Sequence, residues 1–95
     1  ACGTAYAMRY IRANIQGGIE IGFDAATASL IAAQTVKGAA ELLLQKGTHP
    51  EQEIDKVTTP KGCTIAGLNE MEHQGFSSSL IRGITVSFNK IIKAG

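Results

Sequence analysis

The chain has 95 residues, of which 44% are hydrophobic, 18% are charged and only 5% are aromatic, and its formal net charge is +1. This length predicts one small domain, and the near-neutral charge excludes the broad basic surface that nucleic-acid-binding proteins use. Because tryptophan is absent and small or aliphatic residues dominate, a lone chain has few bulky core side chains. We therefore expect further apolar surface to be buried in an oligomer.

The two cysteines, Cys2 and Cys63, lie far apart and lack the spacing of a metal-binding or redox pair. Reduced thiols in a cytoplasmic protein are the default interpretation. Polar residues at Gln34, Lys37 and Glu41 interrupt the longest apolar runs, and no signal peptide is visible, so we expect no membrane interaction. The chain begins at Ala1 without methionine, and we expect it to be a piece of a longer protein.

The first predicted helix covers about residues 5–21, where apolar residues recur at helical spacing. The second covers about residues 25–46, with Asp24 as its N-cap and Gly47 as its left-handed terminator. Small and apolar residues occupy most faces of this second helix, which predicts a central, buried position flanked by other helices, including those of a second subunit. The apolar stripe of the first helix consists of Met8, Ile11, Ile15 and Ile19.

Three more helices are predicted along the rest of the chain. A third helix covers about residues 49–57, with a proline in its first turn. A fourth covers about residues 63–74, and a fifth begins with Ser77 as its cap and ends near Lys93. No strand-like alternation of useful length is found, so the predicted fold class is all-α, with about five helices joined by short turns.

The most informative stretch lies between the third and fourth helices. Pro60 disfavours helical conformation at Thr59, so the chain arrives extended, and Gly62 permits close backbone approach and dihedral angles that other residues resist. The next helix then opens with amides that have no internal partner, which favours a carboxylate or phosphate. Thr64 can cap this helix or donate its hydroxyl to a ligand. The alternative is an ordinary loop followed by an ordinary helix cap.

Other kinds of chemistry find little support. Glu70, Glu72 and His73 lack the number and spacing of zinc ligands, so we predict no metal site. No phosphate-binding loop and no dinucleotide fingerprint is present, and neither a Ser/His/Asp set nor a pair of hydrolytic carboxylates can be assembled. The anion-binding turn is thus the one site that the residues themselves predict.

A set of motifs resembles a known family. The pattern over residues 55–68 is similar to the signature of pyrroline-5-carboxylate reductase, which typically reads D-x-V-x-S-P-G-G-x-T-I-A-G-L. Lys61 stands where that family has glycine, and Thr59 stands where it has serine. The motifs follow one another in the family's order and match its C-terminal, helical dimerisation half. They are Gly3-Thr4-Ala5-Tyr6, Ala33-Gln34-Thr35-Val36-Lys37-Gly38-Ala39-Ala40, Asp55-x-Val57-x-Thr59-Pro60-x-Gly62-x-Thr64-Ile65-Ala66-Gly67-Leu68 and Glu72-His73-Gln74-Gly75-Phe76.

The resemblance implies reduction of 1-pyrroline-5-carboxylate to L-proline, the last step of proline biosynthesis, with NADPH or NADH. The cofactor would bind mainly to an N-terminal Rossmann domain outside these 95 residues, so the chain alone is expected to be inactive. The amides of Gly62, Cys63 and Thr64 would bind the substrate carboxylate, and the Thr64 hydroxyl, the catalytic group, would hydrogen-bond the ring nitrogen. The remaining substrate-binding residues would be Lys56, Val57 and Thr59.

The family also implies a homodimer with helices interlaced between two subunits, and in some members a ring of dimers. Residues 1–95 would form a single domain for dimerisation and substrate binding. Two other functions remain open at this point. One is a non-catalytic helical dimerisation module, in which the Pro-Gly turn serves only as a cap, and the other is a related imine reductase with a different substrate.

Overall fold

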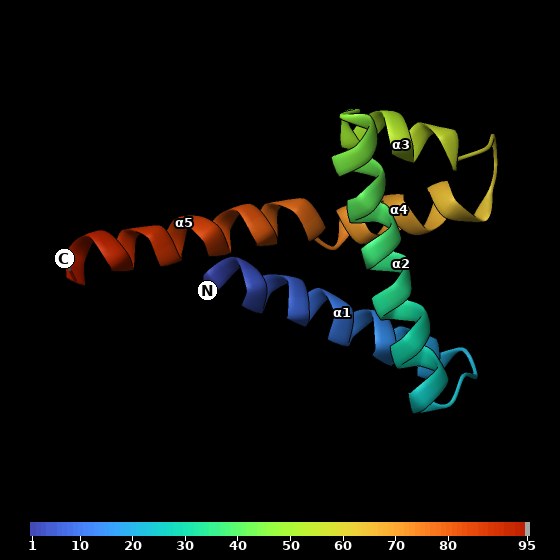
Figure 1. Cartoon of the computed structure of the whole chain (residues 1–95), viewed down its shortest axis with the longest axis horizontal. Coiled ribbons are helices and arrows are strands. Elements are labelled where there is room, and N and C mark those ends of the chain that lie inside the picture. Colours follow the sequence, from blue (N-terminus) through green and yellow to red (C-terminus); the bar gives the residue numbers. More distant parts are fainter. Residues whose placement is uncertain (95) are drawn as a thin grey trace. The chain divides into compact units, whose positions relative to one another are not determined.

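The computed structural model describes residues 1–94, and this part of the chain contains helices and no strand (Figure 1). None of its helices is both long enough and apolar enough to cross a membrane. The all-α prediction with five helices is confirmed. The helices are α1 (Cys2–Glu20), α2 (Ala25–Lys46), α3 (Pro50–Lys56), α4 (Cys63–His73) and α5 (Phe76–Ala94).

The first compact unit contains α1 and α2. The helix α1 begins three residues earlier than predicted, because the amide of Ala5 already donates to the carbonyl of Ala1. The close contact between the two helices depends on small residues. A Cβ added at Gly18 would lie 3.1 Å from the Cβ of Ala28, so any side chain there would crowd the contact between these helices.

Both ends of α2 agree with the sequence prediction. Asp24 caps the helix, accepting hydrogen bonds from the amide of Thr27 at 3.2 Å and from its hydroxyl at 2.7 Å. These bonds, chiefly the one from the hydroxyl, hold the pKa of Asp24 below its usual value because they stabilise the carboxylate. Gly47 ends the helix in the left-handed conformation, with φ 65°, and its amide donates to the carbonyl of Leu43.

The second compact unit contains α3, α4 and α5. Ser77 was predicted to cap α5, but that prediction is wrong, because the helix begins at Phe76 and the amide of Ser79 already donates to the carbonyl of Gly75. The hydroxyl of Ser77 instead donates to a carboxylate oxygen of Glu72 at 2.5 Å. Gly75 has φ 89°, so a single left-handed residue makes the junction between α4 and α5.

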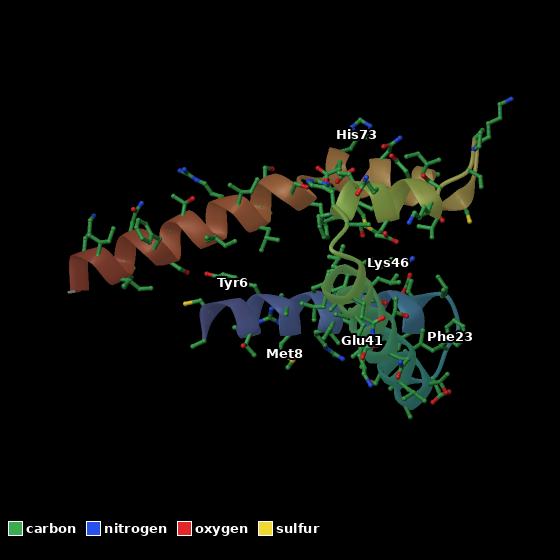
Figure 2. The ribbon with its side chains drawn as sticks, turned by 45° about the horizontal axis from the view of Figure 1, so that its top comes forward. Tyr6, Met8, Phe23, Glu41, Lys46 and His73 are labelled. Atoms are coloured by element: carbon green, nitrogen blue, oxygen red, sulfur yellow. The ribbon has the colours of Figure 1, made fainter. Side chains whose placement is uncertain are left out.

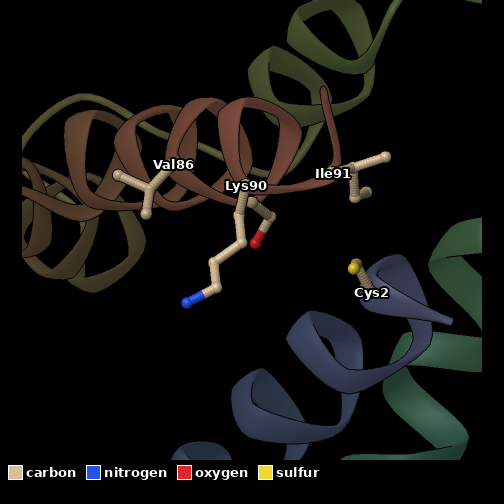
Figure 3. A pocket seen from close by; sticks show the side chains of 5 residues that line it. Cys2, Val86, Lys90 and Ile91 are labelled. Atoms are coloured by element: carbon tan, nitrogen blue, oxygen red, sulfur yellow. The ribbon is translucent and has the colours of Figure 1, made fainter. Parts of the chain in front are cut away.

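Burial in the single chain is slight. Ala28 and Ala32 are the buried hydrophobic residues of the part that the structure describes, so α2 is covered along one small stretch rather than on all faces. Figure 2 shows the side chain of Met8 projecting from α1, and Figure 3 shows Val86 and Ile91 projecting from α5. Large apolar side chains are exposed on every long helix. They include Met8, Ile19, Leu30, Leu44, Leu80, Ile84, Val86, Phe88 and Ile91.

Candidate functional site

The predicted anion-binding stretch forms a tight turn between α3 and α4. Pro60 occupies its second position, and the amide of Gly62 donates to the carbonyl of Thr59 at 2.9 Å, which closes the turn. Lys61 at the third position has φ 61°, the geometry of a turn that normally prefers glycine there. Among the non-glycine residues from 1 to 94, Lys61 is the one with a positive φ.

Gly62 is needed for a different reason from the one that the sequence suggested. Its dihedral angles, φ −76° and ψ 168°, belong to extended backbone that any residue adopts, so the prediction of an unusual conformation at Gly62 is wrong. The constraint is space. A Cβ at this position would overlap with Oγ1 of Thr59 and lie 3.0 Å from the Thr59 carbonyl oxygen. The unusual backbone conformation belongs to the preceding residue, Lys61.

The N-terminus of α4 carries unpaired amides. Gly62 is the N-cap residue and supplies no side chain, and the first helical hydrogen bond runs from the amide of Ala66 to the Gly62 carbonyl. Within residues 1–94, no protein group accepts a hydrogen bond from the amides of Cys63, Thr64 or Ile65. Three N–H groups at the positive end of a helix dipole are thus available to an anion.

This geometry changes the predicted set of carboxylate-binding amides by one residue. The amide of Gly62 is already used by the Thr59 carbonyl, so the three free groups belong to Cys63, Thr64 and Ile65 rather than to Gly62, Cys63 and Thr64. The sequence could have indicated Ile65, because every α-helix leaves its first few amides unpaired. The motif directed attention to the glycine instead.

The hydroxyl of Thr64 does not cap the helix. Thr64 is exposed in the second position of α4, and within the described part of the chain its hydroxyl forms no hydrogen bond. The exposed Cys63 thiol is also free. The hydroxyl of Thr64 and the three amides therefore belong to the same first turn of one helix and are all uncommitted.

The remaining predicted residues lie at the other end of the connection. Lys56 is the last residue of α3, and its ammonium forms an ion pair with Glu53 at 3.3 Å rather than standing free. Val57 follows it and is 65% exposed. The turn brings Thr59 into contact distance of Gly62, whereas Lys56 and Val57 precede that turn and stay on the α3 side of it.

The acidic residues at the end of α4 serve the next junction. Glu70 accepts a hydrogen bond from the side-chain amide of Gln74 at 3.3 Å, and Glu72 accepts one from Ser77. No group of three or more metal-ligating side chains occurs within residues 1–94.

Comparison with known proteins places these features in one family. A family model described as pyrroline-5-carboxylate reductase dimerisation matches residues 1–93. The chain is 67% identical over 90 residues to pyrroline-5-carboxylate reductase 1 of Dictyostelium discoideum, covering 95% of this chain and 16% of that protein. It is 57% identical over 94 residues to pyrroline-5-carboxylate reductase 2 of the same organism, covering 99% and 31%. The chain thus spans less than a third of the length of either relative.

A solved structure agrees with the fold. The crystal structure of Plasmodium falciparum pyrroline carboxylate reductase with NADP bound superposes with a TM-score of 0.90 and 26% sequence identity. The superposition covers 94% of this chain and 34% of the Plasmodium chain. The matched part makes up about a third of the Plasmodium chain.

Proposed function

Because the chain belongs to the pyrroline-5-carboxylate reductase dimerisation family, we propose that it is the subunit-joining and substrate-binding domain of an enzyme that reduces 1-pyrroline-5-carboxylate to L-proline. The match of a single family model to residues 1–93 supports treating them as one functional domain. The observation that carries the substrate assignment is the set of free amides at the start of α4.

The substrate is a small ring with one carboxylate, and the first turn of α4 suits that group. The amides of Cys63, Thr64 and Ile65 lack protein acceptors, and the helix dipole adds positive potential at the same place. A carboxylate bound there gains charge-assisted hydrogen bonds, which are shorter and stronger than neutral ones. The carboxylate would thereby fix the position of the whole ring.

The hydroxyl of Thr64 supplies a second, directional contact. A ring held by its carboxylate can still rotate, and a hydrogen bond between the Thr64 hydroxyl and the ring nitrogen removes that freedom. Fixing the C=N bond in one orientation would contribute a large part of the rate enhancement, because hydride transfer requires the acceptor carbon to lie at a defined distance from the hydride donor. Thr59, on the other side of the turn, completes the polar wall of the site.

The hydride comes from NADPH or NADH, whose nicotinamide ring supplies it when bound. Residues 1–94 contain no strand and no glycine-rich strand–turn–helix motif, so we assign no residue of this chain to the dinucleotide. The cofactor would bind to a part of the enzyme outside these residues. The free thiols of Cys2 and Cys63 are compatible with the reducing environment of the cytoplasm, where we place the enzyme.

The partner is a second copy of the chain. Leu44 on α2 is 84% exposed, Leu30 is 71% exposed and Ile91 on α5 is 62% exposed. Burying one such side chain fully contributes about 1.5–3 kcal/mol, whereas the described part of the chain buries only Ala28 and Ala32 and so has little other apolar stabilisation. We propose a homodimer in which helices of the two subunits interlace, with rings of such dimers as a further possible assembly.

The proposal is tested in the full-length enzyme by following NADPH oxidation with 1-pyrroline-5-carboxylate and identifying proline as the product. Thr64→Ala should lower kcat/KM by about 10²-fold, because the ring loses its fixed orientation, while Thr64→Ser retains the hydroxyl and should restore most of the activity. Unfolding temperatures of the variants control for folding. Equal kinetics for the unchanged enzyme and Thr64→Ala would remove Thr64 from the site.

Two further outcomes decide between the alternatives. Failure of the full-length enzyme to reduce any cyclic imine would leave a dimerisation module. Preference for a different cyclic imine in a panel of substrates would indicate a related reductase. A sedimentation experiment that found only monomers at micromolar concentration would contradict the proposed homodimer.

A further inference from the structure

The contact between Thr59 and Gly62 ties two positions of the turn together. Gly62 has ordinary dihedral angles, so its backbone does not require glycine, yet a Cβ there would overlap with Thr59 Oγ1 and crowd the Thr59 carbonyl oxygen at 3.0 Å. The same carbonyl accepts the hydrogen bond from the Gly62 amide at 2.9 Å. The Thr59 side chain and backbone are therefore both folded directly over the α-carbon of Gly62.

The position of this contact matters for the residues that follow. Gly62 is the N-cap of α4, and the next residue, Cys63, carries the first free amide. We therefore expect a displacement of Gly62 away from Thr59 to shift the start of the helix and its free amides as well. A tight turn cannot take up a Cβ at Gly62 without a shift, because that Cβ would overlap with Oγ1 of Thr59 and lie only 3.0 Å from its carbonyl oxygen.

Resting on the function proposed above, we propose that Gly62 is a positioning residue that acts through Thr59. Its missing side chain lets Thr59 pack against the N-cap, and this packing sets the distance between the Thr59 hydroxyl and the free amides of α4. The two groups then meet one imino-acid carboxylate from opposite sides. Gly62 itself contributes no contact to the substrate, because its amide is bonded to Thr59.

The test is a double-mutant cycle in the full-length enzyme, with KM for 1-pyrroline-5-carboxylate and KM for NADPH measured separately. Gly62→Ala should lower kcat/KM for the imino acid by roughly 10- to 100-fold, mainly through KM, and leave KM for NADPH unchanged. Gly67→Ala is the matched control, because a Cβ at Gly67 in the same helix meets nothing within 4 Å. It should leave both constants unchanged.

Two substitutions of Thr59 test whether Gly62→Ala acts through the Thr59 side chain. Thr59→Ala removes Oγ1, the atom that would overlap with a Cβ at Gly62. Adding Gly62→Ala to Thr59→Ala should therefore lower kcat/KM for the imino acid by less than about threefold further. Thr59→Val keeps the side-chain shape without the hydroxyl. In the Thr59→Val enzyme, Gly62→Ala should therefore lower kcat/KM for the imino acid by as large a factor as it does in the unchanged enzyme. This pattern of non-additivity is not expected from a general loss of folding, which the unfolding temperature of each variant reports.

Two results would overturn the proposal. One is an active unchanged enzyme in which Gly62→Ala alters neither KM, and the other is an equal cost of Gly62→Ala in the Thr59→Ala and Thr59→Val backgrounds. Both leave the proposed reductase function standing. If the unchanged enzyme fails to reduce the imine at all, the proposed function and this positioning role fall together.

Discussion

Two residues with almost the same left-handed backbone conformation carry different side chains, and this difference leads to a quantitative prediction. Lys61 has φ 61° and Gly47 has φ 65°. A residue with a Cβ pays roughly 1–2 kcal/mol in this region, whereas glycine avoids that cost but loses about 0.5–1 kcal/mol more backbone entropy on folding. Lys61→Gly should therefore raise the free energy of unfolding by about 0.5–1 kcal/mol.

Gly47→Ala is the opposite change in the same conformation. Nothing lies within 4 Å of a Cβ added at Gly47, so the substitution tests the backbone cost without a steric contribution. We expect it to lower the free energy of unfolding by about 0.5–1 kcal/mol. The variant that combines Lys61→Gly with Gly47→Ala should then unfold near the temperature of the unchanged protein.

The measurement is thermal unfolding of the full-length enzyme by circular dichroism, at one fixed protein concentration because oligomers unfold in a concentration-dependent way. A change of 1 kcal/mol corresponds to about 2–4 °C in a domain of 150–250 residues. Destabilisation by Lys61→Gly would refute the argument, since it would mean that the lysine side chain stabilises the turn by more than its backbone conformation costs.

Three further predictions concern the two helical units. Asp24→Ala should lower the unfolding temperature at neutral pH. Because the pKa of Asp24 is lowered in the folded chain, its stabilisation is present above the unfolded pKa and is lost as pH falls through the folded pKa. The unfolding temperatures of the variant and the unchanged protein should therefore converge in acid. Gly17→Ala should stabilise α1 by about 0.5–1 kcal/mol, since a Cβ there meets nothing within 4 Å. Gly18→Ala should stabilise the protein less or destabilise it, because its Cβ would crowd Ala28. Equal unfolding temperatures for these two variants would contradict the close packing of Gly18 against α2. Phe88→Glu should shift the sedimentation equilibrium toward monomers, because it places a charge on the exposed apolar stripe of α5, and an unchanged dimer would remove that stripe from the interface.

The helices and their ends followed closely from local rules. Asp24 as N-cap and Gly47 as terminator were both predicted, because each satisfies backbone groups within a few residues of itself. Ser77 was assigned wrongly for an instructive reason. A serine near a helix start resembles a cap, but its hydroxyl donates to the carboxylate of Glu72, five residues earlier, and the helix begins two residues sooner than a cap at Ser77 requires.

The turn and the helix start that form the candidate site lie where the sequence predicted them, but their local geometry was not predicted in detail. The sequence motif located the turn and the free helix N-terminus, and the resemblance named Thr64. The division of roles between Lys61 and Gly62 was not foreseen, because the pattern Pro-Lys-Gly does not say which residue takes the positive φ and which needs the space. The sequence also did not predict that the Gly62 amide would donate to the Thr59 carbonyl. Because of this bond, the three free amides are those of Cys63, Thr64 and Ile65.

By itself, the amino-acid sequence determined the fold class, the ends of α2 and the position of the turn between α3 and α4, since all three depend on interactions between residues close together along the chain. Only the tertiary structure decided that α2 is buried in this chain at Ala28 and Ala32, and that Thr59 lies over Gly62. The physical reason is that burial and atomic overlap depend on which surfaces meet in space. An apolar stripe indicates that a helix face must be covered, but not whether its own chain supplies the cover.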